Sequence, residues 1–204
     1  MPKIFVITNR TLTNGRPLVS VIREAAATGA DAVILREKDL AVAELYELGA
    51  EMSAICTGTE TKLIINSSVE TAIACNASGI HLGTGSLPLK VVRAMVPEKI
   101  VGVSVHSTAE ALQAQADGAD YVLAGHVFPT RSKPGLAGRG LDFISSVKAS
   151  VKIPVIAIGG INPENAAGVI QAGANGIAVM SLVMEATDIT GTIKALRRSM
   201  LSVQ

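Results

Sequence analysis

Aromatic residues are nearly missing from this chain: only 2% of its 204 residues are aromatic, and none is tryptophan. Hydrophobic residues nevertheless make up 49% of the sequence, so the core must be built mainly from Ile, Val, Leu and Ala. The charges almost cancel, leaving a formal net charge of +1. The sequence has no excess of basic residues to attract nucleic acid, and no aromatic side chains interleaved with basic ones to stack on bases. The protein is therefore not expected to bind nucleic acid.

Cysteines and long apolar runs are equally scarce. Cys56 and Cys75 are the two cysteines, and they lie in apolar helical patterns without metal-ligand spacing. We expect both to be buried thiols of a protein in a reducing compartment. No apolar run approaches the length of a membrane span. The chain enters a strand-like segment at Lys3 without the pattern of a signal peptide. We therefore expect a soluble, cytoplasmic protein without a membrane partner.

Short apolar segments alternate along the chain with segments whose apolar residues recur at helical spacing. No two strand segments are separated by a tight hairpin turn, and each is nearly continuous in apolar residues, as buried parallel strands are. The predicted strands are Lys3–Thr8, Ala32–Leu35, Lys62–Ile65, Gly79–Leu82, Ile100–Val103, Asp120–Ala124, Val155–Ile158 and Gly176–Met180. The predicted helices lie between them. The one after the seventh strand is expected to start at Asn162-Pro163, a good N-cap and first-turn pair, and the last one, Ile189–Met200, closes the chain.

Eight such strand–helix units predict an α/β fold, a (β/α)8 TIM barrel that occupies residues 1–204 as a single domain. The length is near the lower end for this fold. An open doubly wound sheet is the alternative, but it would need fewer strands, and the first turn lacks a dinucleotide-binding fingerprint. In a barrel, the functional residues are expected in the loops that follow the strands.

The loop after the sixth predicted strand combines a histidine with several cations. His126 follows the strand directly, and Arg131, Lys133 and Arg139 come next among glycines and prolines. Imidazole titrates near neutral pH, so His126 is a candidate for proton transfer on an anionic small molecule. His81 and His106 also fall at strand ends, where a structural, hydrogen-bonded histidine is an equally good interpretation.

Two further strand ends carry features of anion sites. Gly159 and Gly160 follow the seventh strand, where glycines let backbone N–H groups approach a phosphate, and Ser181 follows the eighth. Barrels commonly bind phosphate at these two loops. Arg36 and Lys38 follow the second strand at a spacing that would place both on one face. They are either a solvated edge or a site for a carboxylate or phosphate.

Several motifs in order along the chain resemble the thiamin phosphate synthase/TenI family of small barrels. They are LREK at 35–38, IN at 65–66, GIHLG at 79–83, VGVSVHS at 101–107, YVLAGHVFPTRSKPGLAGRG at 121–140, PVIAIGGINPEN at 154–165 and GIAVMS at 176–181. The synthase pattern has acids that hold Mg²⁺ at positions that here resemble Ser67 and Ser86. It also has a Gln at the place of Ile34, and Gly-Pro where this chain has Gly125-His126.

These departures make the chain similar to the TenI branch, which implies an isomerase: a thiazole tautomerase of thiamin biosynthesis. The implied reaction converts the non-aromatic carboxythiazol-5(2H)-ylidene ethyl phosphate to the aromatic carboxythiazole ethyl phosphate. His126 would be the acid/base, and no cofactor or metal is implied. The substrate-binding residues implied by the resemblance and the strand ends are Arg36, Lys38, Asn66, Ser104, His106, Lys133, Gly159, Gly160, Met180 and Ser181. A homodimer is implied as well.

Two other functions stay open at this point. One is a thiamin phosphate synthase, which couples pyrimidine pyrophosphate with thiazole phosphate in the presence of Mg²⁺. The other is a regulatory protein that binds a phosphate ligand without turning it over.

Overall fold

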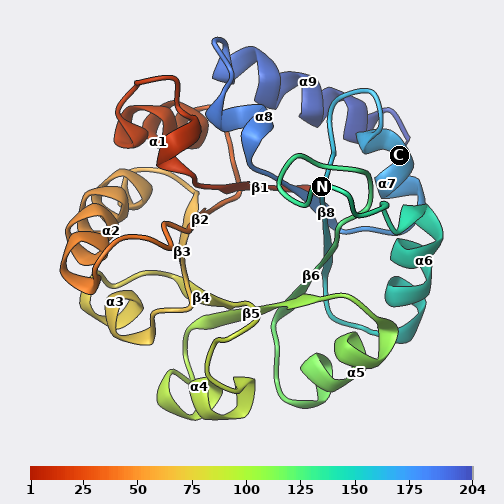
Figure 1. Cartoon of the computed structure of the whole chain (residues 1–204), viewed down its shortest axis with the longest axis horizontal. Coiled ribbons are helices and arrows are strands. Elements are labelled where there is room, and N and C mark those ends of the chain that lie inside the picture. The colour runs from red at the N-terminus through yellow and green to blue at the C-terminus, as the bar shows by residue number, and fades with distance from the viewer. Residues whose placement is uncertain (204) are drawn as a thin grey trace.

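Eight parallel strands close into one barrel in the computed structural model, which describes residues 1–203. Each strand pairs with its neighbours in the sequence, and the last pairs with the first. Figure 1 looks down the barrel axis, with the helices outside the strands. The predicted (β/α)8 barrel is therefore confirmed, and the open doubly wound sheet is wrong. The strands are β1 (Lys3–Ile7), β2 (Ala32–Leu35), β3 (Lys62–Asn66), β4 (Gly79–Leu82), β5 (Ile100–Val105), β6 (Tyr121–Gly125), β7 (Val155–Ile158) and β8 (Gly176–Val179).

The helices cover the outer face of these strands. They are α1 (Leu18–Ala27), α2 (Val42–Thr57), α3 (Val69–Ala74), α4 (Leu89–Met95), α5 (Thr108–Ala116), α6 (Gly140–Ser150), α7 (Ala166–Gln171), α8 (Ser181–Met184) and α9 (Ile189–Leu201). The sequence did not predict α8 or the 3-10 turn η1 (Arg10–Leu12). Both are too short to show a repeating apolar pattern.

The start of α7 also differs from the prediction. The sequence predicts that Asn162 caps this helix, whereas the helix begins at Ala166. The side-chain oxygen of Asn162 instead accepts hydrogen bonds from the backbone N–H groups of Glu164 and Asn165, at 2.9 and 3.2 Å. Asparagine often stabilises a turn in this way, and here the turn lies ahead of the helix.

Alternating side chains of each strand fill two different layers of the core. In β1, Ile4 and Val6 pack toward the helices, whereas Phe5 and Ile7 point toward the barrel axis. This alternation follows from the two-residue period of a strand. The interior layer is therefore a packed core and not a pore. Its buried members are Phe5, Ile7, Ala32, Ile34, Ile64, Tyr121, Leu123, Ile156 and Ala178.

Tyr121 is the largest side chain inside the barrel. Its ring lies where a side chain at Gly102 of the paired strand would otherwise be, so that only glycine fits there. The ring also meets Phe5 edge to face, with the centroids 5.2 Å apart. Burial raises the pKa of the Tyr121 hydroxyl, which stays protonated and contacts His81. Tyr121 thus links the apolar core to the polar end of the barrel.

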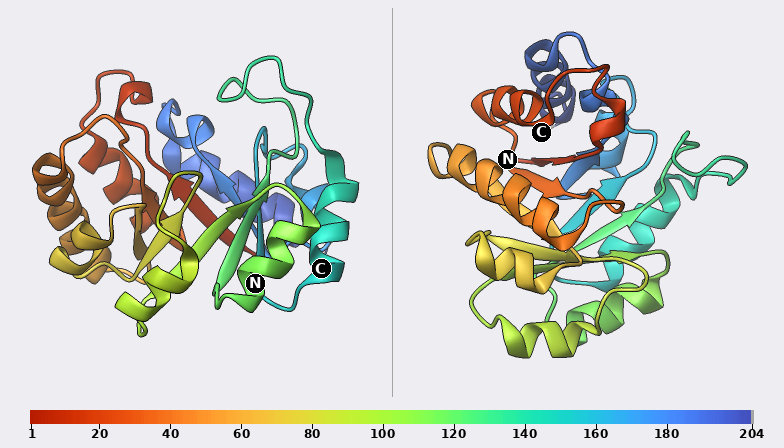
Figure 2. Two further views of the ribbon diagram at one scale, coloured as in Figure 1. Left: turned by 60° about the horizontal axis from the view of Figure 1, so that its bottom comes forward. Right: turned by 60° about the vertical axis from the view of Figure 1, so that its left-hand side comes forward.

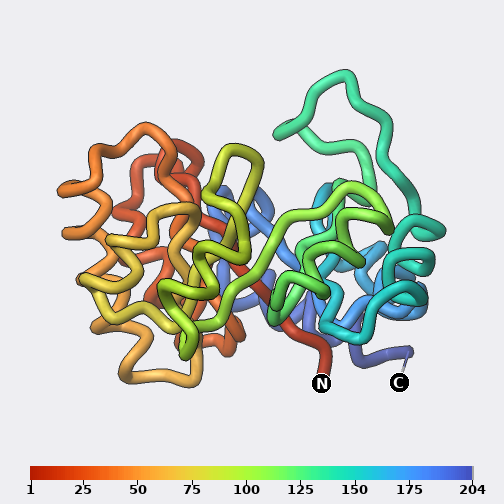
Figure 3. The backbone as a smooth tube through the Cα atoms, turned by 90° about the horizontal axis from the view of Figure 1, so that it is seen from below, coloured from red at the N-terminus to blue at the C-terminus, as the bar shows by residue number. Residues whose placement is uncertain are grey.

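The two ends of the barrel differ. The loop of residues 126–139, which follows β6, stands out from one end in both views of Figure 2. In Figure 3 the two termini lie at the opposite end. No helix within residues 1–203 is both long enough and apolar enough to cross a membrane.

Candidate active site

A cavity of about 280 Å³ opens at the carboxyl ends of the strands, under the loop of residues 126–139. We call it the main cavity. Its base is apolar and is formed by the inward-pointing side chains Ile7, Ile34, Leu123, Ile158 and Ala178. The predicted site residues that line it are Arg36, Asn66, Ser104, His106, His126, Lys133, Gly159, Gly160, Met180 and Ser181. Lys38 does not line this cavity but a neighbouring one.

The turn after β7 forms one wall of the main cavity. Gly159 and Gly160 have φ values of +107° and +65°, in a region that other residues rarely adopt. A side chain at Gly159 would overlap His126, and one at Gly160 would overlap the backbone oxygen of Pro129. Next to this turn, the short helix α8 begins at Ser181. The loops after strands seven and eight, together with a short extra helix, are the recurrent phosphate site of such barrels.

His81 is a structural histidine that orients a neighbour. It is buried, with Nδ1 3.1 Å from the hydroxyl of Tyr121 and Nε2 2.8 Å from Oγ of Ser104. Burial, and then the nearby charge of Arg36, lower the pKa of His81 to about 4. The ring is therefore neutral at pH 7 and holds Ser104 at the wall of the main cavity.

His126 is buried but is not held by a comparable network. Its Nε2 lies 3.4 Å from the backbone oxygen of Leu136, which is a long contact. Its Nδ1 is the one buried side-chain nitrogen or oxygen without a hydrogen-bond partner within residues 1–203. Buried polar atoms are nearly always paired, so an unpaired one beside a cavity marks a place where a ligand can bind.

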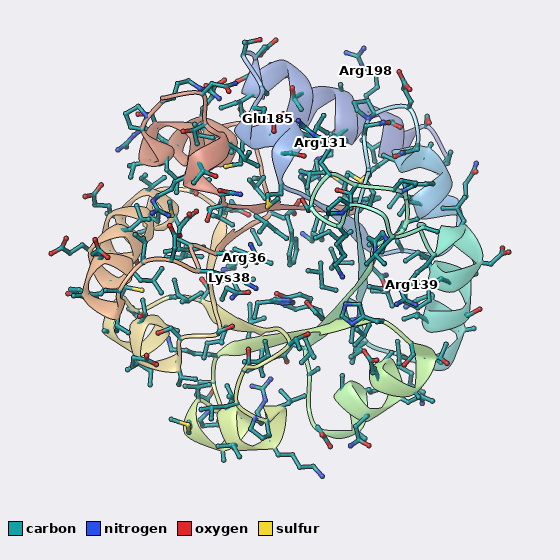
Figure 4. The ribbon with its side chains drawn as sticks, viewed as in Figure 1. Arg36, Lys38, Arg131, Arg139, Glu185 and Arg198 are labelled. Carbon is teal, nitrogen blue, oxygen red and sulfur yellow. The ribbon has the colours of Figure 1, made fainter. Side chains whose placement is uncertain are left out.

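The loop of residues 126–139 brings cations to the mouth of the main cavity. Lys133 Nζ lies 3.5 Å from His106 Nε2, and His106 Nδ1 lies 3.4 Å from a carboxylate oxygen of Glu110. Arg131 forms an ion pair with Glu185, which directly follows α8. Figure 4 shows these two side chains side by side, so the loop is tied across the mouth of the barrel. The sequence missed that Thr130 and Ser132 of this loop also line the cavity, since a loop hydroxyl carries no sequence signal of its own.

Arg36 and Lys38 do not occupy the single strand face predicted from their spacing. The strand ends at Leu35, so the two-residue alternation no longer applies beyond it. Arg36 lines the main cavity, whereas Lys38 lines a second cavity of about 590 Å³, which we call the side cavity. Asn66 lines both, so the two cavities adjoin. Both cations lie toward the inside of the ring of helices in Figure 4.

Hydroxyl groups occupy the part of the side cavity where the synthase resemblance implies Mg²⁺. The Oγ atoms of Ser67 and Ser86 are 2.9 Å apart, and Ser67 Oγ also accepts a hydrogen bond from Asn66. The nearby Glu37 is buried, and both of its oxygens accept the backbone N–H of Arg10 at 3.1 Å. In the described part of the chain, no three His, Cys, Asp or Glu side chains gather as metal ligands. Since Mg²⁺ is usually bound through carboxylates, these residues do not fit it.

A closed barrel with a glycine turn, a cationic loop and a cavity at its carboxyl end is the arrangement seen in TIM-barrel enzymes that bind phosphate. Its sequence matches the family described as thiamine monophosphate synthase over residues 4–183. The chain therefore belongs to the thiamine monophosphate synthase/TenI family, which is a family of enzymes, and the resemblance seen in the sequence is confirmed.

Relatives across this family are similar over almost their whole length. The thiamine-phosphate synthase of Moorella thermoacetica is 45% identical over 95% of this chain and 93% of its own. That of Chloroflexus aurantiacus is 40% identical over 96% and 91%. A solved thiamine phosphate pyrophosphorylase from Pyrococcus furiosus has a TM-score of 0.90 at 39% identity, covering 98% of this chain and 96% of that one. A 3-hexulose-6-phosphate synthase, with a TM-score of 0.69 at 16% identity, shares the fold alone.

These relatives overturn the tautomerase prediction, and with it the isomerase class. That prediction depended on a few positions, chiefly His126, Ser67 and Ser86, whereas relatives called synthases match some two-fifths of all positions. A histidine at a strand end does not by itself specify proton transfer, because the same imidazole can bind a ligand or support a wall. The inference from His126 to a reaction was therefore wrong.

Proposed function

We propose that this protein is a thiamin phosphate synthase, a transferase that couples pyrimidine pyrophosphate with thiazole phosphate and releases pyrophosphate. The observation that carries the proposal is the 39–45% identity, over nearly the whole chain, to proteins named for this activity. The activity belongs to the single domain of residues 1–204, and we place it in the cytoplasm, in keeping with the two buried free cysteines.

The geometry of the main cavity supports a phosphorylated ring as substrate. The apolar base offers a surface to the faces of flat rings. The turn at Gly159 and Gly160, together with Ser181, is suited to the phosphate of the thiazole. Arg36 and Lys133 supply positive charge at two sides of the opening.

The remaining polar residues of the main cavity are proposed to contact substrate rather than to transfer protons. His126 presents an unpaired Nδ1 in a buried position, where a ligand atom would complete its hydrogen bonding. Asn66, Ser104 and His106 line the same space, and Met180 adds an apolar contact. Under this proposal the role of His126 is substrate binding.

The test is to incubate the purified protein with both substrates and to measure thiamin phosphate and released pyrophosphate by chromatography. Equal amounts of the two products are expected. Arg36→Gln and Lys133→Gln should each lower kcat/KM by about tenfold or more, because each removes a charge-assisted hydrogen bond. Lys152→Gln, an exposed change at the far end of the barrel, is the matched control. If neither product forms under any condition, the proposal is wrong.

The family resemblance also leads us to propose a homodimer. Val91 and Met95, four residues apart on α4, and Ile73 on α3 are each about half exposed. Ile73 and Met95 line one shallow surface pocket, so they form a joint apolar patch that a second copy would cover. Sedimentation should give twice the 21.0 kDa chain mass, and Val91→Glu should give the single mass. A wild-type monomer at micromolar concentration contradicts the proposal.

A further inference from the structure

The side cavity has the donors of an anion site in the place where the resemblance implies a metal. Lys38 is exposed and lines the side cavity together with Asn66, Ser67 and Ser86. None of the ion pairs found within residues 1–203 involves Lys38. Its ammonium group therefore has its three donors available beside two serine hydroxyls.

The acidic side chains near this cavity do not supply the missing metal ligands. The carboxylate of Glu37 accepts the backbone N–H of Arg10 and lies 3.3 Å from Nη1 of the same arginine. Asp39 accepts hydrogen bonds from both Nη1 and Nη2 of that guanidinium, at 2.6 and 2.7 Å. Glu70 also lines the side cavity but is exposed on α3. Arg10 thus neutralises the two acids that flank Lys38.

Serine and carboxylate side chains interact with phosphate oxygens in opposite ways. Two carboxylates would repel a pyrophosphate unless a divalent cation lay between them. A serine hydroxyl can donate directly to a phosphate oxygen, and a lysine adds a strong charge-assisted hydrogen bond. In this chain the oxygens of Ser67 and Ser86 already lie 2.9 Å apart, held by Asn66 and by the backbone N–H of Gly83. Because one of the two hydroxyls must donate to the other, one hydroxyl hydrogen of the pair remains free to donate to an anion.

We propose that the side cavity binds the pyrophosphate group directly, through Lys38 and the hydroxyls of Ser67 and Ser86, and that the protein neither holds nor needs Mg²⁺ there. This inference rests on the proposed synthase function. In that reaction the bond between the pyrimidine's methylene carbon and a pyrophosphate oxygen breaks, and the electron pair stays on that oxygen. The thiazole nitrogen supplies the electron pair for the new bond to carbon. Lys38 stabilises the negative charge that develops on the leaving pyrophosphate.

The direct test is calorimetric titration of the protein with inorganic pyrophosphate in buffer containing EDTA. The wild-type protein should bind, and Lys38→Gln should weaken binding by about tenfold or more, the usual effect of losing a charged donor. A Ser67→Ala/Ser86→Ala variant should also bind more weakly. Lys152→Gln, which changes the same type of residue far from the cavity, should bind like the wild type. Absence of wild-type binding, or unchanged binding by Lys38→Gln, overturns the inference.

A second measurement uses Mn²⁺ alone as the probe, followed by its electron paramagnetic resonance signal. The wild-type protein should leave Mn²⁺ free, and Ser67→Asp/Ser86→Asp should bind one ion per chain, because it restores a pair of carboxylates. Stoichiometric binding of Mn²⁺ by the wild type overturns the inference.

Measuring the coupling reaction in EDTA distinguishes a failure of this inference from a failure of the proposed synthase function. Coupling of the two substrates that continues in EDTA supports both. Coupling that stops in EDTA and returns with Mg²⁺ overturns the inference and leaves the synthase function standing. If no coupling occurs but pyrophosphate binding in EDTA depends on Lys38, the proposed function fails and the anion site stands.

Discussion

Replacing His81 by glutamine should remove a pH-dependent loss of stability that the buried imidazole causes. His81 lies between the hydroxyl of Tyr121 and Oγ of Ser104, and burial lowers its pKa to about 4 from an ordinary value of 6.5. Between these two values the unfolded chain binds a proton at this residue and the folded protein does not. The contribution of His81 to the free energy of unfolding is therefore fully present above pH 6.5 and decreases as the pH falls toward 4.

The size of the effect follows from the two pKa values. At pH 5 the unfolded state gains about 2 kcal/mol from protonating His81, while at pH 7 it gains only about 0.2 kcal/mol. Glutamine has no titrating group, and its amide can hydrogen-bond both hydroxyl partners. The loss of about 2 kcal/mol between pH 7 and pH 5 should therefore be present in the wild type and absent from His81→Gln.

Urea unfolding at pH 7, 6 and 5, followed by circular dichroism, measures this difference. Most carboxylates stay ionised in this range, so the comparison of the two proteins isolates the histidine. The expected outcome is that the free energy of unfolding of the wild type falls by about 2 kcal/mol relative to that of the variant between pH 7 and pH 5. If the free energy of unfolding has the same pH dependence in the wild type and the variant, the folded protein binds a proton at His81 as readily as the unfolded chain does, and the reasoning is refuted.

Three further predictions concern other parts of the barrel. Gly102→Ala should lower the free energy of unfolding by about 2 kcal/mol, because the ring of Tyr121 fills the space that the new methyl group needs; urea unfolding that matches the wild type contradicts this. Burial raises the pKa of Cys56 to about 11, so a thiol reagent at pH 8 should modify it only at the rate of unfolding, and rapid labelling of the folded protein would be the opposite result. Arg131→Ala should raise KM about threefold to tenfold with little change in Tm, since the ion pair with Glu185 is exposed and worth at most about 1 kcal/mol. An unchanged KM would show that the ion pair is not needed to hold the loop of residues 126–139 for substrate binding.

The barrel itself was predictable because its signals are local. Each strand is a short apolar run and each long helix repeats its apolar residues, so the order of elements is visible without any contact between distant residues. The exceptions are instructive. The four-residue helix α8 has no room for a repeat, and Asn162 stabilises a turn instead of capping α7.

The site was predictable in position but not in arrangement. Strand ends converge at one end of a parallel barrel, so residues such as Arg36 and Ser181 were expected to meet. The division of Arg36 and Lys38 between two cavities was not, because it depends on where β2 ends and on the packing of Asn66 between the two. The prediction of a tautomerase from His126 was wrong because a histidine at a strand end can transfer protons, bind a ligand or support a wall, and the sequence does not distinguish these roles.

The sequence by itself determined the parallel alternation of strands and helices, the closed barrel, and the end at which the polar residues gather, because all three follow from periodicity and chain connectivity. The tertiary structure decided which of those residues act together. His81 and Tyr121 are 40 residues apart, and Ser67 and Ser86 are 19 apart, yet each pair meets within hydrogen-bonding distance. Such contacts depend on the register between neighbouring strands and on the paths of the loops, which no local pattern encodes.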